Sequence, residues 1–270
     1  MPAVAPRRVR KQVFGQDPWT YDHARLPYPR RVFDILTSRC GLGPGTAAFE
    51  IGPGTGIVTR DLLRRGAGPI TVIEPDPRLV RYLSSSLGPD AARVHIEPVP
   101  FEKVVLPRAG FDLGVAATSF HWLPERSALR KVARALRPGG WWVAWGNRYG
   151  RSFRSNAFHR AIQPLYRELY GRPAARPTWR SDVARDRRDR LRALREVGAF
   201  DRISFEEVER IETVNSARVA ALWGTFSEVL TLPRRKRVWF LTELERVADE
   251  RFAGQVPLPV RTPIYTARRR

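Results

Sequence analysis

The sequence has little of what a disulfide-bonded, metal-binding or membrane-spanning protein needs. Its single cysteine, Cys40, excludes an internal disulfide and a metal site built on cysteines, and four scattered histidines do not favour a zinc site. The chain has no run of about 18 apolar residues, so we expect no membrane span. The basic N-terminal residues are not followed by the apolar segment of a secretory signal, and we therefore expect a cytoplasmic protein.

Lysine is also scarce, and the positive charge comes almost entirely from arginine. The chain has 48 basic and 27 acidic residues and a net charge of +21, but only four of the basic residues are lysines. Such a field attracts polyanions and favours a nucleic-acid substrate. The arginines are spread through every segment, however, as a GC-rich genome would also produce. Since no basic strip with interleaved aromatic residues occurs, nucleic acid remains the second hypothesis for the partner.

The most informative segment is a glycine-rich turn, Gly52-Pro53-Gly54-Thr55-Gly56, between an apolar run and a helical pattern. Glu50 precedes its first glycine by two positions, and the next apolar run ends in Glu74, eighteen residues after its last glycine. A strand, a glycine turn, a helix and a second strand ending in a carboxylate are typical of the nucleoside-binding half of a doubly wound sheet. Glycine permits positive φ and close contact between ligand and backbone, and a carboxylate can accept hydrogen bonds from both ribose hydroxyls.

Two features of this turn argue against a nicotinamide dinucleotide. The third small residue of the dinucleotide fingerprint would be Ile57 here, and its bulk spoils the packing of helix against strand. In addition, Glu50 would face a pyrophosphate of like charge. A nucleoside with an ammonium group and no phosphate fits better, and S-adenosylmethionine is such a ligand.

The rest of the first half continues the alternation of strands and helices. Residues 111–117 are expected to form a buried strand that runs into Thr118-Ser119-Phe120-His121-Trp122-Leu123. An amphipathic helix then ends before Pro138-Gly139-Gly140, and residues 141–146 form the next strand. These motifs and the opening segment, residues 21–29, resemble the class I S-adenosylmethionine-dependent methyltransferases, in particular the small-molecule group with the ubiquinone-type and trans-aconitate-type enzymes. The resemblance covers residues 20–147 and the remainder only in outline.

The alternation and the resemblance together predict an α/β fold, namely a doubly wound, mostly parallel seven-stranded sheet with helical cap insertions. We expect a single methyltransferase domain over residues 1–270. Its parts would be an N-terminal arm or lid (1–27), the cofactor-binding core (28–146), cap insertions (147–200 and 214–255) and the closing strand and tail (256–270). Pro263 in the last strand indicates an irregular or exposed position.

The resemblance implies a cofactor site assembled from several segments. The residues expected to bind S-adenosylmethionine are Tyr21, Arg25, Glu50, Gly52, Pro53, Gly54, Gly56, Glu74, Pro75, Phe101, Glu102, Thr118 and Ser119. The glycines would contact the amino-acid part, Glu50 its amino group and Glu74 the ribose hydroxyls. Phe101 and Glu102 would line the adenine.

The remaining residues of this set have less specific expectations. Thr118 and Ser119 would lie beside the methyl group, because they directly follow the strand expected at residues 111–117. Tyr21 and Arg25 would fold over the methionine carboxylate, or else belong to ordinary surface packing.

His121 is the candidate general base. It lies just past the strand expected at residues 111–117, at the mouth of the expected crevice, and imidazole titrates near neutral pH. The alternative is a histidine that packs with Trp122 and binds a loop. Further candidates for the pocket, which could equally be core residues, are His159, Trp179, Trp223 and Phe226.

The function expected from these observations is methyl transfer. An oxygen, nitrogen or carbon atom of a small-molecule acceptor would displace the methyl group of S-adenosylmethionine in line. The alternatives are an RNA methyltransferase, suggested by the net charge, and a non-catalytic S-adenosylmethionine-binding protein.

Overall fold

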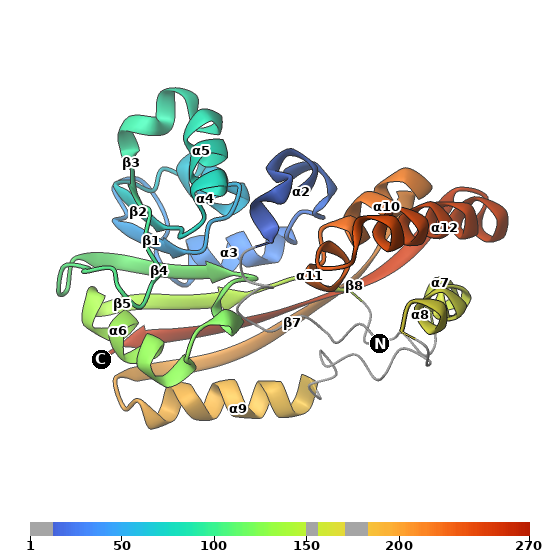
Figure 1. Cartoon of the computed structure of the whole chain (residues 1–270). Coiled ribbons are helices and arrows are strands. Elements are labelled where there is room, and N and C mark those ends of the chain that lie inside the picture. The colour runs from blue at the N-terminus through green and yellow to red at the C-terminus, as the bar shows by residue number, and fades with distance from the viewer. Residues whose placement is uncertain (1–12, 150–155, 171–182) are drawn as a thin grey trace. The chain divides into compact units, whose positions relative to one another are not determined.

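The computed structural model of the protein describes residues 13–149, 156–170 and 183–270 (Figure 1). The chain divides into two compact units, which we describe separately. The sheet unit comprises residues 28–147, 184–208 and 262–270, and the helical unit comprises the described residues of 1–27, 148–183 and 209–261. Strands β7 (Phe200–Asn215) and β8 (Gln255–Arg269) each contribute residues to both units. The single domain over residues 1–270 stays a prediction.

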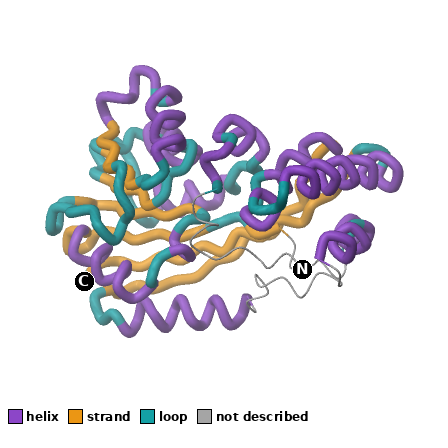
Figure 2. The backbone as a smooth tube through the Cα atoms, viewed as in Figure 1, coloured by secondary structure: helices purple, strands orange, loops and turns teal. Residues whose placement is uncertain are grey.

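The sheet unit is built on strands that alternate with helices (Figure 2). Besides parts of β7 and β8, its elements are α3 (Arg30–Ser38), β1 (Ala48–Ile51), α4 (Ile57–Arg64), β2 (Ile70–Ile73), α5 (Pro77–Ser86), η2 (Gly88–Arg93), β3 (Val94–Glu97), β4 (Phe111–Ala117), η3 (Phe120–Trp122), α6 (Glu125–Ala135), β5 (Leu136–Trp145) and α9 (Val183–Glu196). The strand order is β3-β2-β1-β4-β5, and all four pairs are parallel. Strand β8 follows β5 and is antiparallel to it, and β7 pairs with β8. The predicted class, a doubly wound and mostly parallel sheet, is confirmed.

The number of strands differs from the prediction, because the described residues form a sheet of eight strands and not seven. The additional strand is β6 (Arg148–Tyr149), which pairs with residues 260–261 of β8 and is too short to leave a pattern in the sequence. Pro263 is buried in β8 and not exposed. It lies between the residues that pair with β6 and those, from Ile264 onward, that pair with β5. A proline without an N–H is tolerated at such a change of partner.

Hydrophobic side chains cover both faces of the sheet unit. Successive residues of a strand point to opposite faces, and Val72 and Ile73 of β2 accordingly belong to different clusters. Helices α3, α4 and α5 contribute to the first cluster, and α6 and α9 contribute to the second. Because strands covered on both faces are apolar throughout, these strands were visible in the sequence as continuous apolar runs.

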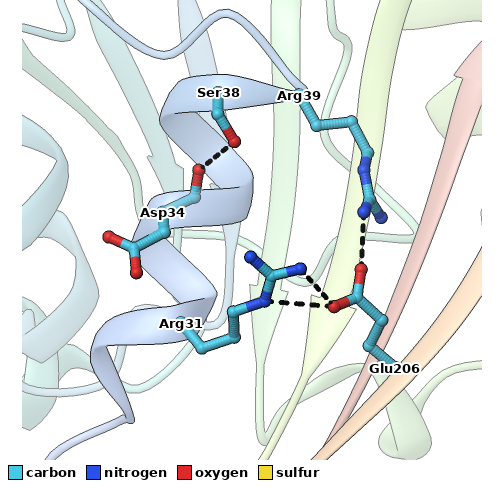
Figure 3. Close-up of polar contacts among 5 residues, drawn as sticks. All are labelled: Arg31, Asp34, Ser38, Arg39 and Glu206. Carbon is cyan, nitrogen blue, oxygen red and sulfur yellow. Dashed lines mark hydrogen bonds and ion pairs between the residues drawn. The ribbon is translucent and has the colours of Figure 1, made fainter.

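Helix α3 is joined to β7 by one carboxylate (Figure 3). Glu206 accepts hydrogen bonds from Nε and Nη2 of Arg31 at 3.1 and 2.7 Å, and from Nη2 of Arg39 at 2.6 Å. Partial burial raises the pKa of Glu206, but the hydrogen bonds from the two guanidinium groups outweigh it and lower the pKa overall. Since Arg31 lies in the first turn of α3 and Arg39 directly follows its last residue, both ends of the helix are held.

The helical unit has a hydrophobic core of its own. Besides parts of β7 and β8, its elements are η1 (Phe14–Gln16), α2 (Pro18–Ala24), β6, α7 (Ala157–Ala161), α8 (Gln163–Tyr170), α10 (Ser216–Gly224), α11 (Ser227–Leu230) and α12 (Arg234–Phe252). Phe158, Trp223 and Phe240 are fully buried in it. Among the described residues, no helix combines the length and the apolar character that crossing a membrane requires.

Candidate active site

The glycine-rich turn follows β1 and adopts backbone conformations that favour glycine. The φ angles of Gly52, Gly54 and Gly56 are +66°, +61° and +89°. A Cβ atom on Gly52 would lie 2.7 Å from Cβ of Ser119, and one on Gly56 would lie 2.4 Å from Cδ1 of Leu83. On Gly54, by contrast, a Cβ atom would meet no described atom within 4 Å. The turn is therefore closely packed at its ends and open in its middle.

Glu74 follows β2 directly, and its carboxylate holds the open part of the turn. Its Oε2 accepts a hydrogen bond from the N–H of Gly54 at 3.1 Å, and its Oε1 accepts one from the N–H of Asp76 at 3.0 Å. Only 6% of Glu74 is exposed. This burial raises the pKa of the carboxyl group to about 7, although both hydrogen bonds lower it. A buried carboxylate thus lies beside backbone that a ligand can approach.

Glu50 supplies a second buried carboxylate near the turn. It lies in β1, is 1% exposed, and accepts a hydrogen bond from Oγ1 of Thr59 in α4 at 2.7 Å. Burial raises its pKa to about 7, the Thr59 hydrogen bond lowers it, and the negative charge of Glu74 raises it further. Two carboxylates that disfavour each other's ionisation suit a cationic ligand, which would stabilise both in the charged form.

The segment after β4 completes this edge of the sheet. The hydroxyl of Ser119 donates a hydrogen bond to the carbonyl oxygen of Ile51, next to the turn. Thr118 has a φ of +58°, which is unusual for a β-branched residue. Its N–H donates to the carbonyl oxygen of Trp145 at 2.8 Å, and its Oγ1 lies 2.9 Å from the hydroxyl of Tyr28. Residues held in such conformations are concentrated at functional sites.

Direct contacts therefore connect three of the expected segments, because Gly54 donates to Glu74, and Ser119 packs against Gly52 and donates to Ile51 just before the turn. Two prolines of the set lie beside them. Pro53 is buried, and its carbonyl oxygen accepts the N–H of Gly56 at 3.0 Å, whereas Pro75 is exposed.

The two residues expected at the adenine have other surroundings. The ring of Phe101 is buried in the hydrophobic cluster that contains Phe49 and Ile73. Lys131 lies over this ring at 5.0 Å and donates a hydrogen bond to the Phe101 carbonyl oxygen at 2.6 Å. Glu102 is exposed. Contact of either residue with adenine stays a prediction.

Tyr21 and Arg25 belong to the helical unit. Arg25 donates a hydrogen bond to the carbonyl oxygen of Thr225 at 3.0 Å, and its guanidinium lies 4.7 Å from the ring centroid of Tyr21 and 5.2 Å from that of Phe226. These contacts are what the surface-packing alternative describes. The expected role on a methionine carboxylate stays a prediction.

His121 is an exposed residue of η3. Its ring centroid lies 4.8 Å from that of Trp122, which is the packing named as the alternative to a general base. The exposure leaves the imidazole accessible, so the contact does not decide between the two hypotheses.

The other pocket candidates lie in the helical unit or outside the described residues. His159 is buried, and its burial lowers the pKa to about 3, so that the imidazole is neutral at physiological pH. Trp223 is a core residue and Phe226 packs against it. Trp179 lies outside the described residues. Within the described ranges, no group of histidine, cysteine and acidic side chains is placed to hold a metal ion.

Sequence reasoning did not single out Thr59 or Tyr28, although both contact expected site residues. The sequence indicates Thr59 only weakly. It is a polar residue beside Val58 on the buried face of α4, where an apolar residue is usual. Tyr28 lies in the opening segment, but its contact with Thr118 spans 90 residues and leaves no local pattern.

Comparison with known proteins finds a methyltransferase domain in part of the sheet unit. A family model described as a methyltransferase domain matches residues 49–144, from β1 to β5. This segment of the chain is similar to a methyltransferase domain. This segment contains the glycine turn, Glu74 and Thr118-Ser119, which form the edge of the sheet described above.

Individual methyltransferases are similar over part or most of the chain. An uncharacterized methyltransferase of Mycobacterium bovis is 29% identical over 136 residues, which are 50% of this chain and 51% of that protein. The ubiquinone biosynthesis O-methyltransferase of a Methylobacterium species is 32% identical over 139 residues, 49% of this chain and 55% of that protein. The chain thus spans about half the length of the curated relatives it matches.

The fold itself is shared over a greater length. A solved structure from Anaeromyxobacter dehalogenans, provisionally assigned as a type II methyltransferase, has a TM-score of 0.60 at 23% identity and covers 91% of this chain and 97% of that one. At this identity the likeness supports the methyltransferase fold alone.

Proposed function

We propose that the protein transfers a methyl group from S-adenosylmethionine to an oxygen, nitrogen or carbon atom of a small-molecule acceptor. The observation that carries the proposal is the buried carboxylate of Glu74, bonded to the N–H of Gly54 where the turn is open. The two hydroxyls of a ribose can donate to such a carboxylate while the rest of the nucleoside lies along the backbone of the turn.

The chemistry of the donor set fits this cofactor and does not fit a dinucleotide. S-adenosylmethionine has an ammonium group and a sulfonium group but no phosphate. Glu50 and Glu74 are both buried, and a cationic ligand would offset the unfavourable free energy of ionising them there. A pyrophosphate would instead bring negative charge next to two carboxylates.

The residues of the chain would bind and orient the reactants. When bound, S-adenosylmethionine supplies an electrophilic methyl group, so the protein needs only to hold the acceptor atom in line and to accept a proton where the acceptor carries one. Glu74 would fix the ribose, Glu50 would interact with the amino group, and Gly54 would allow close approach to the backbone. Thr118 would lie beside the reacting atoms, and His121 would accept the proton.

The small-molecule class of the acceptor is supported by similarity to the ubiquinone biosynthesis O-methyltransferase. The net charge of +21 favours RNA as the competing acceptor.

Calorimetric titrations test the cofactor first. We expect S-adenosylmethionine and S-adenosylhomocysteine to bind with one-to-one stoichiometry and NAD not to bind; binding of NAD alone would show the proposal to be wrong. Protein supplied with methyl-labelled S-adenosylmethionine is then incubated with pooled small molecules and, separately, with total RNA. Label in the small-molecule fraction is the expected result, and label in RNA would contradict the proposed acceptor class.

A further inference from the structure

The first turn of α12 carries four consecutive cations, Arg234-Arg235-Lys236-Arg237. The first three of these side chains are exposed, and no acidic residue lies in that turn. Arg210, Arg246 and Arg261 of the helical unit form ion pairs, whereas Arg234, Arg235 and Lys236 form none with the described residues. Three positive charges therefore lie side by side without a carboxylate from the described part of the chain.

The charges of α12 oppose its helix dipole. The N-terminal end of a helix is partly positive and is stabilised by acidic residues, whereas the C-terminal end is stabilised by basic ones. In α12 the cations come first, and all four acidic residues lie from Glu243 onward. Because this order destabilises the helix, helix stability does not explain the four cations. An external partner of negative charge would explain them.

Exposed apolar side chains accompany these cations. Val238, which follows Arg237, is 56% exposed, and Trp19 in α2 is 62% exposed. The side chain of Gln16, three residues before Trp19, accepts a hydrogen bond from Nη1 of Arg237 at 3.3 Å, which joins the two segments. We call the set Trp19, Arg234, Arg235, Lys236 and Val238 the basic–apolar patch.

We propose that the basic–apolar patch docks the protein on the surface of an anionic lipid membrane. Acidic headgroups would neutralise the cations, and the interfacial region favours tryptophan and accepts aliphatic side chains. A nucleic acid would also attract the cations, and a base could stack on Trp19. The phosphate backbone of a nucleic acid would gain nothing from Val238, however. The combination of cationic and apolar side chains therefore favours a lipid surface.

This inference does not depend on the proposed function, and vesicle flotation with the full chain tests it. The probes are vesicles of phosphatidylcholine alone and vesicles in which about one third of the lipid is phosphatidylglycerol. The variant Arg234→Gln/Arg235→Gln/Lys236→Gln removes three charges from the patch. A control variant, Arg81→Gln/Arg130→Gln/Arg134→Gln, removes three charges from exposed positions of the sheet unit and changes the net charge equally.

We expect the wild-type protein to bind anionic vesicles and not neutral ones. Each cation near such a surface strengthens binding about fivefold, so the patch variant should bind about 100-fold more weakly and the control variant within about twofold of wild type. Trp19→Ala should weaken binding as well, without changing the net charge. The patch variant should unfold at an unchanged or higher temperature, because cations are unfavourable in the first turn of a helix.

Three results would overturn the proposal. Absence of binding to anionic vesicles is the first, and equal weakening in the patch and control variants, which would reduce the effect to net charge, is the second. The third is tighter binding to a single-stranded RNA oligonucleotide than to anionic vesicles at the same salt concentration, with loss in the patch variant, which would identify a nucleic-acid surface.

Discussion

Replacement of Glu74 by glutamine is the most direct test of the proposed cofactor site. Glutamine has nearly the same size but no charge, and its NH₂ group would face the N–H of Gly54 or of Asp76, which now donate to the carboxylate at 3.1 and 3.0 Å. A hydrogen bond to a charged group contributes about 1.5–3 kcal/mol. Two ribose hydroxyls would each form one with Glu74. Weakening even one of them raises the dissociation constant about tenfold or more.

The assay is calorimetric titration with S-adenosylhomocysteine at pH 8, where Glu74 is mostly ionised because its pKa is about 7. The matched control is Glu97→Gln, since Glu97 ends the neighbouring strand β3 and its carboxylate binds His95 at 2.9 Å. We expect the affinity to fall at least about tenfold for Glu74→Gln and to stay unchanged for Glu97→Gln. A folded Glu74→Gln protein with wild-type affinity would refute the ribose assignment.

Three further predictions concern stability and turnover. The free energy of unfolding should fall as the pH rises from about 5 to 8: the pKa values of Glu50 and Glu74 are raised from 4.5 to about 7 by burial, so the folded state binds more protons than the unfolded state in this interval. Each group contributes on the order of 3 kcal/mol to this loss. In denaturant titrations, the free energy of unfolding of the Glu50→Gln/Glu74→Gln variant should therefore depend less on pH than that of the wild type. Gly56→Ala should destabilise the protein by about 1–3 kcal/mol more than Gly45→Ala. Both glycines have positive φ, but only at Gly56 would the added Cβ lie within 4 Å of another side chain. Equal thermal midpoints of the two variants would contradict this prediction. His121→Ala should change the unfolding free energy by less than about 0.5 kcal/mol, since the residue is exposed, and should lower kcat; an unchanged kcat would exclude the general base.

Most elements of the sheet unit could be predicted, because buried parallel strands are continuous apolar runs and glycine or proline marks where they end. The start of β5 shows where this fails. We expected a strand from residue 141, but β5 begins at Leu136. Leu136 pairs with Phe111 and Trp141 with Leu113, so residues 137–140 form an irregularity within the strand. The glycines that signalled a loop belong to this irregularity.

The conformation of the glycine turn and the position of Glu74 at the end of β2 could be predicted because both depend on local spacing along the chain. Contacts between distant residues could not be predicted in this way. Glu206 holds Arg31 and Arg39 across 175 and 167 positions, and no local pattern pairs these charges in a chain rich in arginine. The bond between Tyr28 and Thr118 is of the same kind.

The energetics of the two carboxylates connect the fold to the proposed function. Thr59 and the N–H groups of Gly54 and Asp76 donate hydrogen bonds to Glu50 and Glu74, yet burial still raises both pKa values to about 7. Ionisation of this pair therefore weakens the ligand-free protein, and folding alone gives no reason to keep two such groups beside one turn. A cationic ligand reverses the balance, because its charge favours the ionised carboxylates. The geometry that lowers stability as the pH rises from about 5 to 8 is thus the geometry that would strengthen binding of a positively charged nucleoside once both carboxylates are ionised.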